Sequence, residues 1–509
     1  MQCIDPKTRA GRAAGLPGLG ALAGAAVLAL TAGCTLGPQY EGPPEVAQQA
    51  VSAAQLQRAA QAGVAAASPP AQWWRTLGDD ALASLIDQAL QGNPNLRAAD
   101  ARLQASRALL SQRRAEMLPS VGASAGYTYL NAPRSLERGL DRALRGAAEA
   151  GGSDPNAVAG VDLDTELYTV ALDASWEIDL FGRRQRATEG ALAQAGADEA
   201  ALADAQVRLA AELGQVYVGY RADQRRLALA QDGLAKVVRM LELTRQRRAQ
   251  GAATEIEIER LVLQQRQEEA RLPQLEAQLQ VALDQMALIT GQVPGALDAR
   301  LAGSQALPRL PAEVAVDDAA SLIRRRPDVR RAERELAAST AQIGEALSGY
   351  FPQVRLLGLI GLGATSPSGL TADSAAVMVS PMLSWSLLDF GRVRARVDQA
   401  RAGREARLAS YEGTVLAALQ DANGALARFG AARRQWATAG QAQASAERAR
   451  DLVQQRYAAG AASLIDALDT QRQALNAQDQ DVGAQAQLLA NYIALQKSLG
   501  LGWQRPAGV

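Results

Sequence analysis

Four segments of the chain alternate apolar side chains with small or polar ones, position by position. The alternation spans 119–131 and 166–180, and it returns more loosely across 352–364 and 375–389. A period of two places the apolar side chains on one face of a β-strand and the polar ones on the other. We therefore predict two pairs of strands. The apolar positions are Val121, Ala123, Ala125, Tyr127, Tyr129, Tyr168, Val170, Leu172, Ala174, Trp176 and Ile178 in the first pair, and Val377, Val379, Leu383, Trp385 and Leu387 in the second.

Long stretches without proline follow each strand pair. No proline occurs in 156–272 or in 382–505, and Ala, Gln, Leu and Arg are abundant there. A continuous helix over 391–457 would be about 100 Å long at 1.5 Å per residue. Helices of this length need packing partners along their whole length, because propensity alone stabilises them little. We predict two long helical hairpins, one turning near 251 and the other near 460.

The chain repeats itself. Trp176–Arg183 and Trp385–Arg392 share the same frame, in which Phe-Gly-Arg follows a tryptophan after four intervening positions. The interval that separates these two tryptophans also separates Gly251 from Gly460. Markers that keep register over such distances indicate two copies of one structural unit. The first copy spans 93–291 and the second spans 326–500.

The first copy holds an insertion. Upstream of the strands, Pro94 corresponds to Pro327, and Pro119 corresponds to Pro352. The number of residues between the two members is the same for both proline pairs. It is larger than the number of residues between the two tryptophans. The extra residues of the first copy fall in 132–160, a stretch that contains Gly, Ala and Asp. We predict a long loop there, and a tolerated insertion indicates an exposed position.

Composition excludes several functional classes. The chain has 53 basic and 53 acidic residues, so its net charge favours no nucleic-acid partner. It has no histidine, and its two cysteines, Cys3 and Cys34, are too few for a cysteine zinc site or a disulfide framework. No Gly-rich phosphate loop or nucleophile elbow occurs. We expect no enzyme activity, no cofactor and no metal site.

The first residues have the pattern of an export signal. A basic start with Lys7, Arg9 and Arg12 precedes a mostly apolar run, and the run ends in a Gly-Cys pair at Cys34. This ending resembles a lipobox, which predicts a signal peptide over 1–33 and N-acyl and diacylglycerol lipid on Cys34. An ordinary signal peptide with a chance cysteine, or a short membrane anchor, remains an alternative. No later segment has about 18 consecutive apolar residues, so we expect no membrane-spanning helix.

Four strands are too few to enclose a pore. A closed barrel needs at least about eight strands, and two hairpins alone leave open edges. Strands of about ten residues with one apolar face suit an outer-membrane barrel. We therefore expect a homotrimer that shares a twelve-stranded barrel. A soluble coiled coil would explain the helices but would leave the strands unexplained.

The order and spacing of several short motifs resemble one known family. This is the TolC-like outer-membrane efflux protein family, specifically the lipoprotein NodT/OprM-type branch that serves resistance–nodulation–division (RND) pumps. The motifs are Cys34–Tyr40, Trp73-Trp74, Asn93-Pro94, the two Trp-x4-Phe-Gly-Arg segments, Arg324–Val329 and Arg456–Gly460.

The resemblance implies a mainly α protein with a membrane β-barrel. The trimeric barrel would continue into a long α-helical periplasmic barrel, with an equatorial belt formed by 34–92, 292–325 and the C-terminal tail 501–509. Trp73-Trp74 would pack in this belt, and Arg324–Arg326 would pair or be solvated at a helix start.

The resemblance also implies a function and partners. The chain would be the outer-membrane exit duct of a tripartite efflux pump, passively conducting drugs, solvents or other small molecules. Its partners would be a periplasmic adaptor protein, a proton-driven RND pump of the inner membrane, and outer-membrane lipid. An outer-membrane duct of a type I protein or metal-ion export system is the alternative.

Two groups of residues acquire roles from the resemblance. The helical tips at Gly251 and Ala252, and at Gly460 and Ala461, would contact the adaptor, although these glycines could simply end helices in the left-handed conformation. Acidic residues just after the tips would ring a constricted periplasmic gate, where three carboxylates per position repel one another and attract cations. The alternative for these acids is a favourable interaction with the helix dipole. The gate residues are Glu257, Asp466 and Asp469.

Overall fold

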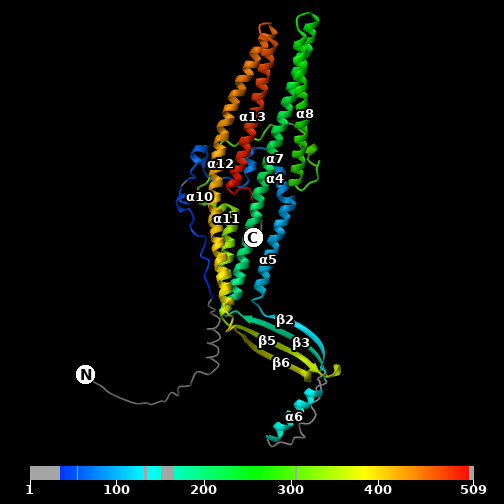
Figure 1. Ribbon diagram of the computed structural model, residues 1–509, viewed down its shortest axis with the longest axis vertical. Helices are drawn as coiled ribbons and strands as arrows, with labels where there is room; N and C mark the ends of the chain where they lie inside the picture. Colours follow the sequence, from blue (N-terminus) through cyan, green and yellow to red (C-terminus); the bar gives the residue numbers. More distant parts are fainter. Residues whose placement is uncertain (1–34, 54, 131–133, 151–164, 304–305, 504–509) are drawn as a thin grey trace, which may run out of the picture. The chain divides into compact units, whose positions relative to one another are not determined.

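The computed structural model (Figure 1) describes residues 35–503 except 54, 131–133, 151–164 and 304–305. The predicted signal peptide and Cys34 lie outside these residues. The chain forms two compact units. One contains the four-stranded sheet and draws on the described residues within 1–40, 109–191 and 339–403. The other is mainly helical and draws on the described residues within 41–108, 192–338 and 404–509.

The four predicted strands form one antiparallel sheet. They are β2 (Ser120–Leu130), β3 (Thr165–Ile178), β5 (Gln353–Ala364) and β6 (Ala375–Ser384), in the order β2-β3-β5-β6. Strands β2 and β5 begin directly after Pro119 and Pro352, so their starts are equivalent positions of the two repeats. Two short 3-10 helices, η4 (Pro367–Gly369) and η5 (Ala372–Ser374), connect β5 to β6.

Strand β6 is shorter than predicted. It ends at Ser384, so Trp385 and Leu387 lie beyond the sheet although they continue the alternation. The reason lies in the next helix. The Asp389 carboxylate accepts hydrogen bonds from the backbone N–H of Gly391 at 3.0 Å and of Val393 at 2.8 Å, and so caps the helix start. The chain therefore leaves the strand conformation before Asp389.

The predicted long loop at 132–160 was wrong in part. Its first half forms a helix, α6 (Arg134–Ala150). This segment has no proline and no β-branched residue, and it is rich in Arg, Leu, Ala and Glu, which favour helices. Its few glycines misled the prediction, because glycine weakens a helix by only about 1 kcal/mol per residue.

The two repeats have helices of equal length. Helices α7 (Arg183–Ala249) and α12 (Arg392–Ala458) each have 67 residues, and α8 (Glu255–Ile289) and α13 (Leu464–Ser498) each have 35. All four boundaries are shifted between the repeats by the interval that separates Trp176 from Trp385. Among the described residues, no helix combines the length and the apolar content needed to cross a bilayer.

Shorter elements complete each unit. Helices α5 (Pro94–Ala115) and α11 (Pro327–Leu347) precede the strand pairs, and η3 (Ser348–Tyr350) follows α11. A small parallel sheet joins β1 (Ala65–Ala66) to β4 (Ala315–Val316), so the two segments assigned to the belt meet through the backbone. The remaining elements are α2 (Gln48–Val51), α3 (Ala59–Ala62), η1 (Trp73–Leu77), α4 (Asp80–Gly92), α9 (Asp298–Leu301) and α10 (Ala319–Arg325).

The core of the helical unit centres on the tryptophan pair. Trp73 and Trp74 are completely buried, their rings meet edge to face at 5.7 Å, and Tyr492 of α13 lies 6.2 Å from Trp73. Two arginines of the run are paired, in agreement with one of the two expected roles: Arg325 forms an ion pair with Asp317 at 2.6 Å, and Arg326 forms one with Asp328 at 2.7 Å. Such pairing keeps a nearly buried guanidinium compensated.

Candidate functional site: the helical tips

Both helical hairpins turn at the predicted glycines. Gly251 has φ +74° and Gly460 has φ +73°, a conformation that glycine adopts without steric cost. The backbone N–H of Ala252 donates to the carbonyl of Arg247, and that of Ala461 donates to Arg456, each at 2.8 Å. These bonds close the ends of α7 and α12 in a Schellman-type arrangement. The glycines thus end the helices, whatever else they contact.

Glu257 begins the first returning helix as part of a capping box. Its carboxylate accepts hydrogen bonds from the Thr254 N–H at 2.7 Å and the Thr254 hydroxyl at 3.0 Å. The Glu257 N–H donates back to the Thr254 hydroxyl at 3.4 Å. Reciprocal bonds of this kind satisfy amide groups that the first helical turn leaves without partners.

Asp466 has the same place in the second hairpin. Its carboxylate accepts from the Ser463 hydroxyl at 2.7 Å and from the Ser463 N–H at 3.2 Å, and its own N–H donates to that hydroxyl at 3.1 Å. These hydrogen bonds, followed by the positive charge of Arg456, hold the pKa of Asp466 below its usual value. Asp466 is exposed and is ionised at neutral pH.

Asp469 differs from the other two acids. It lies three residues after Asp466 on α13 and takes no part in the capping box. Its carboxylate accepts hydrogen bonds from Arg472 at 2.7 Å and Gln473 at 2.6 Å, both on its own helix, and 44 % of its side-chain surface is exposed. Among the described residues, no hydrogen bond or ion pair joins Glu257 to either aspartate. Asp466 and Asp469 lie three residues apart on α13, whereas Glu257 lies on α8.

A small buried cluster lies beside the tips and joins the two hairpins. It contains Val237 and Leu241 of α7, Ile258 and Leu261 of α8, and Leu464 of α13. Nearby, the guanidinium of Arg247 lies 5.0 Å from the ring centre of Tyr457 on α12, a cation–π contact. Our sequence reasoning missed this cluster, although the spacing of 237, 241 and of 258, 261 along their helices is a signal for a shared buried face.

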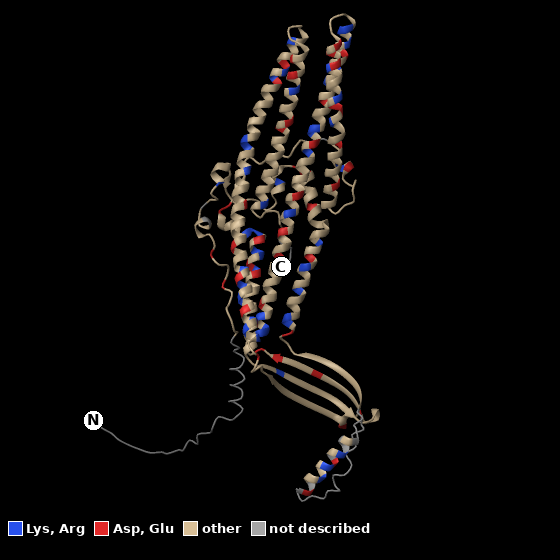
Figure 2. Ribbon diagram, in the orientation of Figure 1, with Lys and Arg blue, Asp and Glu red and all other residues tan. Residues whose placement is uncertain are grey.

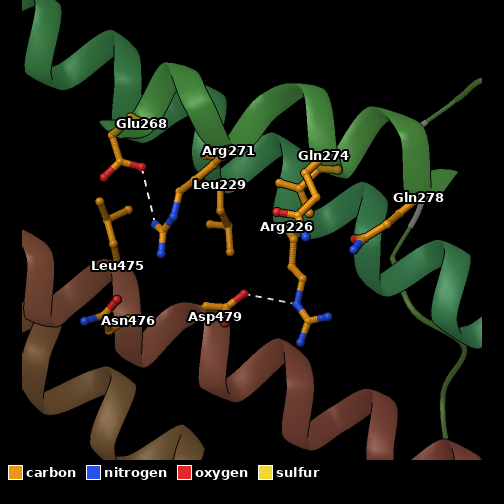
Figure 3. Close-up of a pocket in the computed structure, with 11 residues that line it drawn as sticks. Arg226, Leu229, Glu268, Arg271, Gln274, Gln278, Leu475, Asn476 and Asp479 are labelled. Carbon is orange, nitrogen blue, oxygen red and sulfur yellow. Dashed lines mark hydrogen bonds and ion pairs between the residues drawn. The ribbon is translucent and has the colours of Figure 1, made fainter. Parts of the chain in front are cut away.

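A polar cavity lies elsewhere on the same helices (Figure 3). Its volume is about 270 Å³, and it is lined by α7, α8 and α13. The Arg226 guanidinium donates to Asp479 at 3.0 Å, and Arg271 pairs with the buried Glu268 at 3.4 Å. The facing charges already satisfy one another, so the cavity offers no free charge for a ligand.

The charges of the helical unit follow the same mixed pattern. Figure 2 shows acidic and basic side chains interspersed along the long helices. Among the described residues, no three His, Cys, Asp or Glu side chains gather as a metal site. The geometry of this unit is that of a scaffold with two accessible tips.

Known proteins share this arrangement. The family model for the outer membrane efflux protein matches residues 85–292 and 319–501. Outer membrane protein OprJ of Pseudomonas aeruginosa is 31 % identical over 491 residues, which cover 94 % of this chain and 95 % of OprJ. Nodulation protein T of Rhizobium leguminosarum bv. trifolii is 28 % identical over 480 residues, covering 93 % of this chain and 96 % of that protein.

A solved structure extends the likeness to three dimensions. The outer-membrane channel OprN is 33 % identical, with a TM-score of 0.81, and the match covers 93 % of this chain and all of OprN. OprN is named as a channel, and other relatives, among them the solvent efflux pump outer membrane protein SrpC of Pseudomonas putida, are named as efflux proteins rather than as enzymes. The chain therefore belongs to the outer membrane efflux protein family, in its TolC-like NodT/OprM-type branch, and is an efflux channel of the outer membrane.

Proposed function

We propose that three copies of this chain form the exit duct of a tripartite efflux pump. The duct passively conducts drugs, solvents or other small molecules from the periplasm to the exterior after a periplasmic adaptor docks. One observation carries the proposal: the chain holds a four-stranded sheet that cannot close on itself. Among the described residues, β2 and β6 are edge strands, each paired on one side only. Three such sheets joined edge to edge give a twelve-stranded barrel with no open edge.

The exposed surface of α8 supports assembly. Four large apolar side chains lie on this helix with more than half of their surface exposed: Ile256, Leu263, Val281 and Leu288. A neighbouring subunit would cover them. Val281→Ser combined with Leu288→Ser should lower the trimer fraction measured by sedimentation in detergent. An unchanged trimer fraction would place the interface elsewhere.

Lipid on Cys34 would hold the duct in the outer membrane. The support is the Gly-Cys ending of the apolar run, and Cys34 itself lies outside the described residues. Incorporation of a labelled fatty acid tests the anchor: Cys34→Ala should abolish it. Cys3→Ala is the matched control and should keep the label, since Cys3 lies within the predicted signal peptide.

The two tips would receive the adaptor. Support comes from their geometry: at Gly251 and Gly460 an added side-chain carbon would meet nothing within 4 Å, so the backbone is accessible. Site-specific photo-crosslinking from Ala461 in intact cells, with the captured protein identified by mass spectrometry, is the direct test. A probe at Ala437, which is exposed in the middle of α12, is the control.

The identity of the captured protein separates the alternatives. An adaptor of a proton-driven RND pump supports the tripartite drug or solvent pump. An adaptor of a peptide- or protein-exporting ATPase would keep the duct and change its cargo to that of a type I system. Capture of neither by the folded trimer would remove the tips from the interface.

Asp469 is the strongest candidate for the periplasmic gate. Asp466 and Glu257 each have a structural task in a capping box, whereas Asp469 has none, and a trimer would present three copies of it. Asp466→Ala with Asp469→Ala should raise resting conductance in planar bilayers and weaken block by cations. Asp469→Asn alone should reproduce most of this effect. Ser463→Ala disturbs the cap but keeps both carboxylates, so it should leave conductance and cation block unchanged. Equal effects of Asp469→Asn and Ser463→Ala would mean that the start of α13, and not the Asp469 charge, controls conductance.

A further inference from the structure

The two faces of the four-stranded sheet have different chemistry. One row across the sheet joins Ala123, Leu172, Ile360 and Val377, and all of these side chains are apolar. The adjacent row, on the other face, joins Gly122, Asp173, Leu359 and Met378. Alternation along each strand assigns every other residue to one of these two faces.

The face that carries Asp173 is the one that suits water. It also holds Glu177 and Arg355, which are neighbours in strand register, although the Glu177 carboxylate forms its ion pairs with Arg183 and Arg184. The opposite face has Glu166 near the start of β3 and no charged residue along β5 and β6. Figure 2 shows how few charged positions the sheet has. Charged side chains at the middle of a lipid-facing surface are destabilising, so the Asp173 face lines the pore if the sheet forms the proposed barrel.

The pore face is not uniformly polar. Its β2–β3 half carries mostly small or polar residues, among them Ser120, Gly122, Ser124, Thr169 and Ser175, with Leu167 as an exposed apolar exception near the start of β3. Its β5–β6 half carries an apolar stripe, which we define as Leu357, Leu359, Met378 and Met382. Met378 and Met382 are each 50 % exposed. A water-filled barrel does not need large apolar side chains at these positions.

Two charges flank this stripe: Arg355 is paired in register with Met382 at one end, and the Asp173 carboxylate lies next to Leu359 and Met378 at the other. Asp173 is paired in register with Leu359, and its oxygen atoms lie 3.0 and 3.2 Å from the point where a side-chain carbon of Gly122 would be. The carboxylate is exposed and lies over Gly122 of the neighbouring strand β2, where the absence of a side chain leaves room for it. An apolar surface beside an exposed negative charge complements a molecule that combines apolar groups with a positive charge.

We propose that the pore-facing side of β5–β6 binds lipophilic organic cations as they pass through the barrel. The apolar stripe contacts their hydrocarbon groups, with the two methionines adapting to different shapes, and Asp173 attracts the positive centre. This inference rests on the proposed function, because the barrel decides which face meets the pore. It names a substrate class for the duct itself, separate from any selection by the pump.

Thiol labelling tests separately which face of the sheet lines the pore and whether that face binds lipophilic cations. Met378→Cys and Val379→Cys place a cysteine on neighbouring positions of opposite faces, in full-length protein reconstituted in lipid nanodiscs. A sulfonated maleimide, which does not enter lipid, should label Met378→Cys rapidly and Val379→Cys slowly. The parent protein gives the background from its native cysteines.

Protection by ligand then tests the inference. Tetraphenylphosphonium should slow labelling of Met378→Cys about tenfold when present at roughly ten times its dissociation constant, by mass action. Tetramethylammonium has the same charge and little apolar surface, and it should protect far less. Asp173→Asn in the Met378→Cys protein should weaken the protection by tetraphenylphosphonium.

The outcomes are distinguishable. Faster labelling of Val379→Cys than of Met378→Cys would overturn the orientation of the barrel, and with it the proposed duct and this inference. Labelling of Met378→Cys that is rapid but unaffected by tetraphenylphosphonium would leave the duct standing and overturn the lipophilic-cation site. Equal protection by the two cations would also overturn it, because the apolar stripe would then contribute nothing.

Discussion

Helices α7 and α12 have the same length and the same place in their repeats, yet they bury opposite kinds of residue at equivalent positions. Position 221 of α7 is an arginine with 1 % of its surface exposed. Its equivalent in the second repeat is Gly430. Likewise Tyr217 of α7 corresponds to Leu426 of α12, and both are fully buried.

In α7 the buried polar side chains form a hydrogen-bond network that extends to Asp79 in the predicted belt. The Arg221 Nε donates to the Tyr217 hydroxyl at 3.0 Å, and that hydroxyl donates to the Asp79 carboxylate at 2.8 Å. The guanidinium also donates to the carbonyl of Gly303 at 3.0 Å and to Gln224 at 2.7 Å. Burial is the largest cause that raises the pKa of Tyr217 well above its usual value, so the phenol stays protonated.

In α12 the equivalent position is a glycine, which allows a belt segment to pack directly against the helix backbone. A side-chain carbon on Gly430 would lie 2.9 Å from the Cα of Ala62, so the glycine lets a belt segment lie directly on the helix. Phe429 beside it is fully buried. The comparison teaches that the repeat determines where the helices begin and end, while the belt segment covering each helix determines which side chains it buries.

Removing the polar network should have the largest effect. Arg221→Leu leaves the buried Tyr217 hydroxyl and the buried Gln224 without their charged donor. We expect a loss of about 3 kcal/mol in the free energy of unfolding. Circular dichroism during denaturant unfolding measures it. Arg225→Leu, one helical turn away and exposed, should change stability by less than about 0.5 kcal/mol. Equal losses for both variants would contradict the assigned role of the network.

Filling the close approach on α12 should cost less. Gly430→Ala gains helix propensity but forces a methyl group against the Ala62 backbone, and we expect a net loss of about 1–2 kcal/mol. Gly413→Ala is the matched control on the same helix, because a methyl group there meets nothing within 4 Å in the chain. This control should gain about 1 kcal/mol from propensity alone. The same unfolding experiment should give opposite signs, and stabilisation of both variants would exclude the clash.

The sequence predicts the repeated framework well because local chemistry determines it. Period-two alternation located the strands, and the absence of proline with glycine at 251 and 460 located the hairpins. These signals act within a few residues of the element that they specify. The end of β6 was mispredicted because the hydrogen bonds of Asp389 override a side-chain alternation that continues past Ser384.

The contrast between Arg221 and Gly430 could not be predicted in this way. It depends on which belt segment covers each helix, and that segment comes from a distant part of the chain. The capping boxes are different, since Thr254-x-x-Glu257 and Ser463-x-x-Asp466 have the spacing of a known local motif. That signal was present, whereas our sequence analysis considered only the helix dipole as the alternative to a gate role for both acids.

Both repeats have a capping box at the start of the returning helix, and the second one gives the smallest and most local prediction. Because hydrogen bonds lower the pKa of Asp466 in the folded protein, its ionised form contributes stability that is present above the unfolded value of 3.8. This contribution is lost as the pH falls through the lower folded value. Hydrogen exchange of peptides covering 460–470, corrected for the intrinsic pH dependence, should therefore accelerate only below about pH 4.

Two variants separate the cap from general acid unfolding. Asp466→Asn removes the titrating group, so its peptide should exchange faster than wild type at neutral pH and show no further step on acidification. Ser463→Ala keeps the carboxylate and removes its strongest hydrogen bond, so the step should move up toward the usual aspartate pKa. A step of unchanged position in both variants would mean that another carboxylate controls the start of α13, and Asp469 would then be the first to test because it lies on the next turn of the same helix.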